Sequence, residues 1–186
     1  MWETLGEWDK NLFVYLNNLG SEQYDPLWLL ITKQTSWIPL FILLFYLVYN
    51  KLGRKQSLYL LFFVAVLIAF TDQLANVSKN HFQRLRPCNN AEIICIRKVL
   101  VRNSFSFFSG HAANTMAVTV FLFNTLRHYF KYFVLLFLWP LIFAYSRIYL
   151  GLHYPSDIVF GYFVGALNGV IFYKIYQSAQ RKYFTI

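Results

Sequence analysis

The stretch LFILLFYLVYNKLGRKQSLYLLFFVAVLIAF, residues 40–70, decides the fold. It consists of two apolar runs, and its only charged residues are the basic ones of the segment KLGRK, residues 51–55. Extended to residues 27–50 and 57–78, each run has about the 20 residues that a helix needs to cross a bilayer. We therefore expect a helical hairpin in a membrane, with its turn at the basic segment.

The composition of the whole chain extends this interpretation. Of the 186 residues, 58% are hydrophobic and 13% are charged, and a soluble domain of this length cannot bury so much apolar surface. The sequence lacks the short alternating strands of a membrane barrel, so we expect helices. Three more apolar runs, at residues 109–127, 131–150 and 155–177, complete a predicted all-α bundle of five transmembrane helices, a single domain over residues 1–186.

Residues 1–25 are too polar to cross a bilayer, because they hold five of the eight acidic residues. Apolar side chains nevertheless recur there at helical spacing, namely Leu5, Trp8, Leu12, Tyr15, Leu16 and Leu19. The pattern predicts an amphipathic helix that lies on the membrane surface. A helix packed against the end of the bundle would show the same pattern, and the sequence does not separate the two.

The basic residues of the loops indicate how the bundle is oriented. Lys and Arg without acidic neighbours occupy the 51–55 turn, the 127–131 loop and the C-terminal tail with Arg181 and Lys182. Alternation of five spans puts these segments on one side, which the positive-inside rule makes cytoplasmic. We therefore expect a bacterial inner-membrane protein with a cytoplasmic C-terminus, and with residues 79–108 and 150–155 on the periplasmic side.

The net charge of +9 would fit nucleic-acid binding in a soluble protein, but no basic and aromatic surface stands apart from the predicted spans. The outward-facing loop instead carries basic residues that the positive-inside rule does not explain. They are Lys79, Arg84, Arg86, Arg97, Lys98 and Arg102. Either the predicted orientation is wrong or these residues bind an anionic partner, and we favour the second because the other segments agree on the orientation.

A polar stripe leads into this loop. Its members recur every three or four residues and would share one face of a continuous helix: Asp72, Asn76, Lys79, Gln83 and Arg86. Pro87 would end that helix, and Lys79 and Arg86 would lie two turns apart, roughly 10.5 Å along its axis. Two cations that snorkel to the interface are the alternative.

A second junction is SFSFFSGHAANT, residues 104–115, where a predicted span begins. Ser109 can cap the helix, and Gly110 lets other backbone approach closely. Free N–H groups at a helix start bind anions, and His111 falls in that first turn. Taken alone, His111 is more often an interfacial packing residue.

A third junction is SRIYLGLHYPSD, residues 146–157. Arg147 falls in the last turn of one span, and Pro155 is suited to the first position of the next helix. His153 can then contact Asp157, whose carboxylate would orient the imidazole. An aspartate that only caps the helix, beside an uninvolved histidine, is the alternative.

Together the three junctions point to phosphoryl chemistry. Three cations and a helix N-terminus suit a phosphoryl group that gains charge during transfer. Two imidazoles can divide the work as nucleophile and general acid. Histidines, cysteines and carboxylates do not recur at metal-ligand spacing, so we expect a metal-independent reaction without a cofactor.

These motifs resemble the three-part signature of the type 2 phosphatidic acid phosphatase superfamily, which vanadium haloperoxidases and acid phosphatases share. The matching parts are Lys79-x6-Arg86-Pro87, Ser109-Gly110-His111 and Ser146-Arg147-x5-His153-x3-Asp157. The resemblance covers residues 79–157. The arrangement of predicted helices around these motifs resembles the integral-membrane lipid phosphatase branch of the family. The family usually has a proline before Ser-Gly-His, where this chain has Phe108.

The resemblance implies a role for each matched residue. His153 would attack phosphorus and form a phosphohistidine, Asp157 would orient it, and His111 would protonate the leaving oxygen. The residues that would hold the phosphate oxygens are Lys79, Arg86, Ser109, Gly110 and Arg147.

The resemblance also implies a membrane enzyme that removes a terminal phosphate from a lipid. Undecaprenyl diphosphate is the first candidate substrate, followed by phosphatidylglycerol phosphate and phosphatidic acid, and lipid A is the alternative. A non-catalytic protein that binds or transports phospholipids would need a similar basic pocket and is the alternative from another class.

Two smaller features remain open. Cys88 and Cys95 are the only cysteines and could form a disulfide if their loop is periplasmic, with two free thiols as the alternative. Gly161, Gly165 and Gly169 repeat every four residues, which permits close helix packing within one chain or between two. The oligomeric state is therefore not predicted.

Overall fold

The computed structural model describes residues 2–95, 100 and 102–183, and every regular element among them is a helix. The α-helices are α1 (Trp2–Asn18), α2 (Asp25–Thr32), α3 (Ile38–Phe82), α4 (Gly110–Leu126), α5 (Leu138–Tyr149) and α6 (Pro155–Tyr183). Short 3₁₀ helices lie between them: η1 (Glu22–Tyr24), η2 (Gln34–Trp37), η3 (Pro87–Asn89) and η4 (Phe133–Phe137). The predicted all-α class is confirmed.

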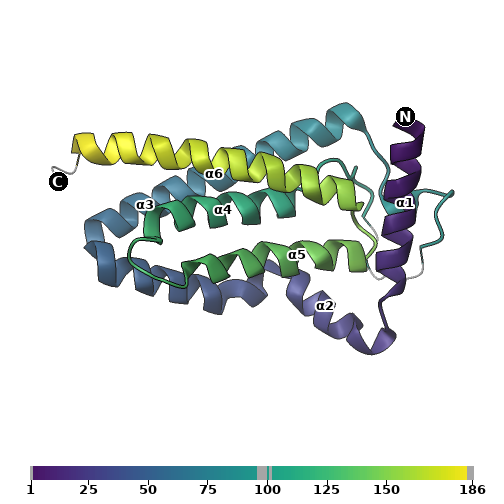
Figure 1. The fold of residues 1–186 in the computed structure, drawn as a ribbon, viewed down its shortest axis with the longest axis horizontal. Coiled ribbons are helices and arrows are strands. Elements are labelled where there is room, and N and C mark those ends of the chain that lie inside the picture. The colour runs from purple at the N-terminus through teal and green to yellow at the C-terminus, as the bar shows by residue number, and fades with distance from the viewer. Residues whose placement is uncertain (1, 96–99, 101, 184–186) are drawn as a thin grey trace.

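Helix α3 contains the predicted hairpin turn. At Gly53 the backbone has φ 73° and ψ 173°, and the chain folds back there into two limbs (Figure 1). Glycine adopts this positive φ without the clash that a Cβ would cause. The first limb packs on α5, where the rings of Phe41 and Trp139 are 5.4 Å apart. The second limb packs on α6, where Asn168 donates to the hydroxyl of Thr71, and on α4, where Ala75 lies beside Gly110.

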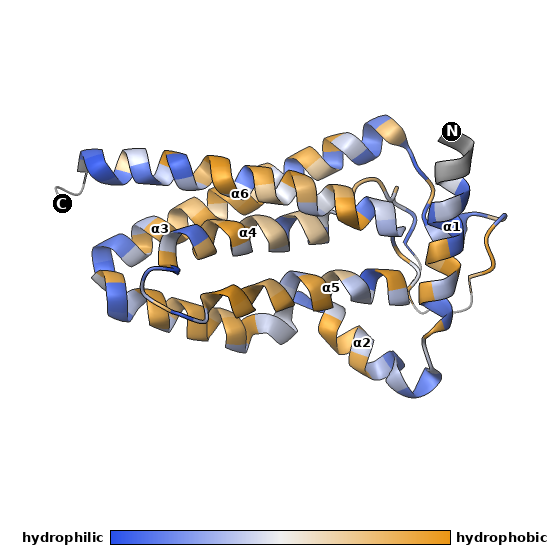
Figure 2. Ribbon diagram, in the orientation of Figure 1, coloured by the Kyte–Doolittle hydropathy of each residue, from blue (hydrophilic) through white to orange (hydrophobic). Residues whose placement is uncertain are grey.

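Apolar residues occupy the middle of the bundle, and hydrophilic residues gather toward its two ends (Figure 2). By length and composition, Gln34–Asn89 and Pro155–Lys182 are apolar enough to cross a membrane, and Phe133–Tyr149 is a shorter apolar helix. The first of these segments includes both limbs of α3. The number of five spans stays a prediction.

Residues 27–50, which were predicted to form one span, are not one continuous helix. Helix α2 ends at Thr32, and η2 leads from there into α3. The indole N–H of Trp37 donates to the carbonyl of Ile31 over 2.8 Å and stabilises the break. Pro39 then falls in the first turn of α3, where its missing N–H costs nothing.

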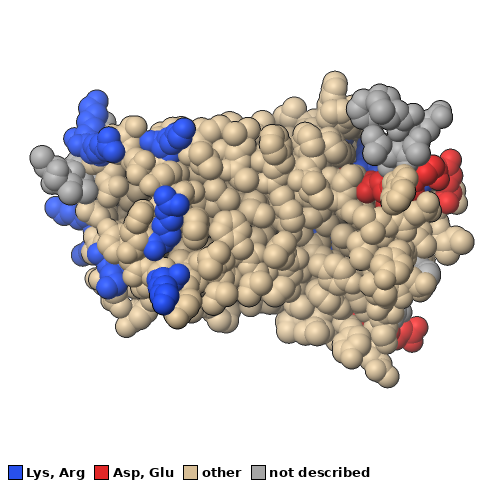
Figure 3. All heavy atoms as spheres, in the orientation of Figure 1, with Lys and Arg blue, Asp and Glu red and all other residues tan. Residues whose placement is uncertain are grey.

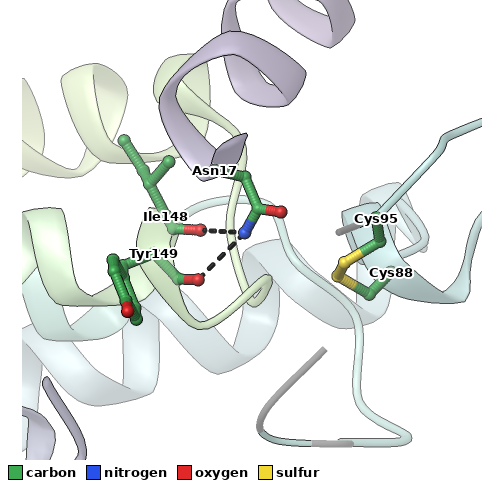
Figure 4. The surroundings of a disulfide bond; sticks show 5 residues. All are labelled: Asn17, Cys88, Cys95, Ile148 and Tyr149. Atoms are coloured by element: carbon green, nitrogen blue, oxygen red, sulfur yellow. Dashed lines mark hydrogen bonds between the residues drawn. A yellow bond between two sulfur atoms is a disulfide. The ribbon is translucent and has the colours of Figure 1, made fainter. Parts of the chain in front are cut away.

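Helix α1 lies across one end of the bundle (Figure 1). Its Asn17 is fully buried and donates from Nδ2 to the carbonyls of Ile148 (3.2 Å) and Tyr149 (2.9 Å), as Figure 4 shows. These carbonyls belong to the last turn of α5, where the carbonyl groups have no N–H partner within the helix. Of the predicted apolar stripe, Trp8 (73% exposed) and Tyr15 (62%) face outward, whereas Leu16 packs on the bundle. Helix α1 therefore packs on the bundle end and exposes part of its apolar stripe, and its location on a membrane surface stays a prediction.

The repeated glycines pack α6 against α4 within the chain. A Cβ at Gly161 would lie 2.7 Å from the carbonyl oxygen of Ser109, and one at Gly169 would lie 2.7 Å from that of Ala117. A Cβ at Gly165 would collide with the carbonyl of Ala113. Only glycine permits this approach of the two helices, so the ladder is an intramolecular contact.

Charge is divided between the two ends of the molecule. Lys and Arg side chains cluster at the end opposite α1, and Asp and Glu appear at the α1 end (Figure 3). This division agrees with the sequence pattern from which orientation was predicted. The side of the membrane that each end faces stays a prediction. Of the basic residues of the outward-facing loop, Arg97 and Lys98 lie outside the described residues.

Candidate active site

Three chain segments meet at the end of the bundle that α1 covers: residues 83–89 after α3, the start of α4, and the turn at residues 150–154 between α5 and α6 (Figure 1). The backbone N–H of Ser109 donates to the carbonyl of Asp157 over 3.0 Å, which ties α4 to α6. The structure therefore brings the three sequence motifs together.

His153 and Asp157 form the buried centre of this region, with exposed fractions of 1% and 0%. Nδ1 of His153 lies 3.4 Å from Oδ2 of Asp157. The same carboxylate oxygen accepts the backbone N–H of Tyr154 over 3.0 Å, which holds it in place. The carboxylate faces Nδ1, so the proton of a neutral ring belongs on Nδ1 and the lone pair on Nε2.

Burial keeps His153 uncharged. It lowers the pKa of His153 to about 4, although the contact with Asp157 acts in the opposite direction. At pH 7 the imidazole is therefore neutral, as a nucleophile must be. Nε2 lies 3.4 Å from Nη1 of Arg86, so an anion held by this guanidinium would lie beside the nucleophilic nitrogen.

Arg86 reaches this position from a loop, and the prediction of one helix continuing to Arg86 is wrong. Helix α3 ends at Phe82, and Gln83 has a left-handed backbone with φ 46°. Pro87 disfavours the helical conformation only at Arg86, the residue before it, and the chain leaves the helix earlier, at Gln83. Lys79 and Arg86 are therefore not two turns apart on one helix.

The side chain of Arg86 is 4% exposed and is held by three hydrogen bonds. Nη1 donates to the carbonyl of Leu152 (2.7 Å), Nε to the carbonyl of Ser104 (2.8 Å), and Nη2 to the hydroxyl of Ser104 (2.9 Å). These bonds fix the cation before any substrate arrives, which is the property that electrostatic catalysis requires.

Arg147 supplies a second buried cation, from the last turn of α5. It is 2% exposed and donates to the hydroxyl of Thr32 at the break after α2. It lines a cavity of about 640 Å³ together with Lys33, Arg102 and His111. We call this space the basic cavity. Three cationic side chains and an imidazole make it suitable for a phosphate.

The start of α4 borders the same region. Ser109 caps the helix as predicted, because its hydroxyl accepts a backbone N–H of the first turn over 3.4 Å. His111 stacks on Phe143 with the ring centroids 5.6 Å apart. A Cβ added at Gly110 would lie 3.6 Å from Nζ of Lys79, so this ammonium group lies beside the helix start.

Sequence reasoning missed the role of Arg84, which it treated as one of several anion-binding residues. The guanidinium donates to Oδ1 of Asp157 (2.7 Å) and to Oδ2 of Asp9 on α1 (2.6 Å). It also stacks 3.8 Å above the ring of Tyr154. Arg84 therefore connects α1 to the carboxylate behind His153. The sequence offered one indication of this contact: the N-terminal segment has an excess of acidic residues, and the loop at residues 79–108 has an excess of basic ones.

Two further predictions concern the loop before α4. The structure joins Cys88 and Cys95 in a disulfide with Cα atoms 5.2 Å apart (Figure 4). Phe108 is 4% exposed and packs 5.8 Å from the ring of Phe160, so packing holds the position where the family usually has proline.

Among the described residues, no three His, Cys, Asp or Glu side chains gather in a possible metal site. Metal independence stays a prediction.

A helical membrane bundle with a basic cavity beside a buried His–Asp pair defines the class of membrane phosphatases. The PAP2 superfamily model matches residues 56–181, more than half of the chain, and the protein belongs to the PAP2 superfamily. As a member of its membrane branch, it is an enzyme, a hydrolase that acts on lipid phosphates. The family thus favours catalysis over a purely lipid-binding or transport role.

Relatives and solved structures agree with this membership. The chain is 32% identical over 181 residues to a lipid A 4'-phosphatase of Bacteroides thetaiotaomicron, covering 94% of this chain and 80% of that protein. It is 28% identical over 185 residues to a lipid A 4'-phosphatase of Porphyromonas gingivalis, covering 97% and 78%.

Two crystal structures share the fold. A transmembrane PAP2-type phosphatidylglycerolphosphate phosphatase from Bacillus subtilis has a TM-score of 0.70 at 18% identity, covering 97% of this chain and 88% of that one. Aquifex aeolicus LpxE has a TM-score of 0.68 at 25% identity, covering 88% and 93%. The arrangement of helices around the site is therefore that of membrane PAP2 enzymes.

Proposed function

We propose that this enzyme removes a phosphate from lipid A through a phosphohistidine formed on His153. The observation that carries the proposal is the geometry of His153, whose Nδ1 lies 3.4 Å from a buried carboxylate and whose Nε2 lies 3.4 Å from the fixed guanidinium of Arg86. A neutral ring oriented in this way presents a lone pair to a bound phosphate.

The reaction has two steps. Nε2 of His153 attacks phosphorus, the bond from phosphorus to the lipid oxygen breaks, and His111 gives that oxygen a proton. Water then attacks the phosphohistidine, its proton passes to His111, and the P–N bond breaks to release inorganic phosphate. Lys79, Arg86 and Arg147, with Ser109 and the N–H of Gly110, bind the phosphate oxygens, whose charge these donors neutralise in the transition state.

The relatives support lipid A over the substrates that the resemblance placed first. Two bacterial relatives that match over most of their lengths are named lipid A 4'-phosphatase. Undecaprenyl diphosphate, phosphatidylglycerol phosphate and phosphatidic acid are the competing substrates. A bilayer substrate can reach the site laterally with its phosphate in the basic cavity, and the outer side of an inner membrane is the proposed location.

Trapping the covalent intermediate tests this function. The purified enzyme is mixed rapidly with lipid A that carries radiolabelled phosphate at the 4' position and is quenched in alkali, which preserves phosphohistidine. We expect label on His153, in the presence of a chelator as well as in its absence. His153→Ala should abolish the label and lower phosphate release by about 10³-fold or more. His128→Ala, at an exposed position remote from the site, is the matched control. Undiminished release by His153→Ala would refute the mechanism.

A further inference from the structure

A second cavity, of about 220 Å³, adjoins the basic cavity between α3, α4 and α5. Both cavities are lined by Gln34 and His111, so the imidazole stands where they meet. In the proposed function His111 protonates the leaving oxygen, which must therefore lie within hydrogen-bond reach of the ring. With the phosphate on the cationic side, the rest of the leaving group falls in this second space, which we call the leaving-group cavity.

Two polar atoms of residues that line the leaving-group cavity are buried and lack partners. Oδ1 of Asn114, an acceptor, and Nε1 of Trp139, a donor, have no hydrogen bond to any part of the chain that the structure describes. Buried polar atoms are nearly always paired in native proteins, so each such exception calls for an explanation. A bound group with both a donor and an acceptor would satisfy the pair.

Asp72 adds a carboxylate to the same wall. It lies in an apolar limb of α3, where an ionisable side chain is expensive and usually functional. Its contacts are weak, because Nδ2 of Asn114 and Nδ2 of Asn76 both lie 3.4 Å from its oxygens. The carboxylate keeps acceptor capacity for a ligand O–H or N–H. It would also repel a leaving group that is itself an anion.

The remaining wall is mostly aromatic. Trp37, Trp139 and Phe143 line the cavity, with the rings of Trp37 and Trp139 6.2 Å apart. Apolar walls with a few placed polar groups are typical of sites that orient a small organic group. A sugar ring has both features that the cavity requires, apolar faces and an edge of hydroxyl and amide groups.

We propose that the leaving-group cavity selects a neutral sugar, with Asp72, Asn114 and Trp139 as the residues that recognise its hydroxyl or amide groups. The inference rests on the proposed function, because it requires His111 to face the leaving oxygen. A diphosphate substrate would place an anionic phosphate against Asp72, and phosphatidic acid would offer no donor to it. The cavity thus favours a sugar phosphate over both.

Asp72 has one competing role, which the experiment must separate. A Cβ at Gly110 would lie 3.6 Å from both Oδ1 of Asp72 and Nζ of Lys79, so the carboxylate could serve only to orient the lysine. If Asp72 only orients Lys79, its loss would slow hydrolysis of every substrate equally, because all of them present a phosphate to Lys79. Loss of sugar recognition would slow only the sugar phosphate.

The test compares kcat/KM for lipid A, phosphatidic acid and a polyprenyl diphosphate in one detergent. Asp72→Asn should lower the value for lipid A by about 10- to 100-fold, the factor for one charge-assisted hydrogen bond. Phosphatidic acid should change little, and the diphosphate should be hydrolysed as fast or faster. Trp139→Phe, which keeps the ring and removes the N–H, should lower only the lipid A value, by about 3- to 10-fold. Gln73→Ala, on an exposed residue outside the cavity, is the control.

An equal loss on all three substrates, or no loss on lipid A, would overturn the assignment of Asp72 while the phosphohistidine mechanism stands. A wild-type enzyme that hydrolyses phosphatidic acid but not lipid A would overturn the proposed substrate and this inference together. Label on His153, measured with the same proteins, reports on the mechanism independently of either result.

Discussion

At the scale of single residues, the chemistry depends on a histidine that burial keeps neutral. His153 is 1% exposed, and its two ring nitrogens face groups of opposite charge, Asp157 and Arg86. The carboxylate supports a ring that becomes positive or phosphorylated, and the guanidinium attracts the group to be transferred. Each neighbour thus acts at a different stage of the reaction.

The lowered pKa of His153 predicts an acid-sensitive fold. An unfolded histidine takes up a proton near pH 6.5, but the folded His153 resists protonation down to a pKa of about 4. The unfolded state therefore binds the proton first as pH falls. The stability that His153 contributes is complete above about pH 6.5 and is lost toward pH 4, by about 3 kcal/mol. Denaturant unfolding in detergent at pH 7 and pH 4 measures this difference.

His153→Gln should show a smaller loss of unfolding free energy between these two pH values, because glutamine does not titrate. His128→Gln, at an exposed position, should behave as the wild type does. An identical pH dependence in His153→Gln and the wild type would show that burial of this ring does not govern acid stability.

At the scale of elements, apolar runs and turn-forming residues predicted which segments are helical. Where the helices end, however, depends on contacts between residues far apart in the sequence. The hairpin turn falls at Gly53, inside the basic segment, because glycine and solvated cations both favour a turn there. The end of α3 at Phe82 and the break after Thr32 were not predicted. They accompany bonds of Arg86 to Leu152 and of Arg147 to Thr32, between residues far apart in the sequence.

Arg84 makes α1 part of the active-site support. It is the cation that contacts both Asp157 and Asp9, and without it a fully buried carboxylate would lose its ionic partner. We expect Arg84→Met to lower kcat by about 10- to 100-fold with little change in KM, as loss of an outer partner does in metal sites. Arg84→Lys, which keeps a charge, should recover part of this loss. Steady-state kinetics on lipid A measure both values.

The control for Arg84 is Lys10 on α1, which forms exposed ion pairs with Glu7 on the same helix and with Glu92 in the loop after η3. Exposed pairs contribute little, so Lys10→Met should leave kcat nearly unchanged. A loss in Arg84→Met that appears only in KM would assign the residue to substrate binding and contradict a positioning role.

At the scale of the whole molecule, the order of motifs predicted that the site residues share one side of a membrane, but not how they touch. Lys79 follows a predicted span, His111 lies in the first turn of another and His153 stands between two, so alternation alone brings them to one end of the bundle. The contact between Asp9 and Arg84 could not be predicted in this way. It depends on how α1 lies across the bundle end, and periodicity left that placement open.

The division of charge between the two ends predicts the orientation of the enzyme. We expect the basic end of the molecule to lie on the cytoplasmic side, which would leave α1 and the active site outside. In a Cys88→Ser and Cys95→Ser background, Glu92→Cys and Lys55→Cys place single thiols at exposed positions, one in the loop beside α1 and one near the hairpin turn. In intact cells, a membrane-impermeant thiol reagent should label Glu92→Cys, and it should reach Lys55→Cys only after permeabilisation. Because the two variants differ only in position, the reverse labelling pattern would place the basic end outside and the phosphatase site in the cytoplasm.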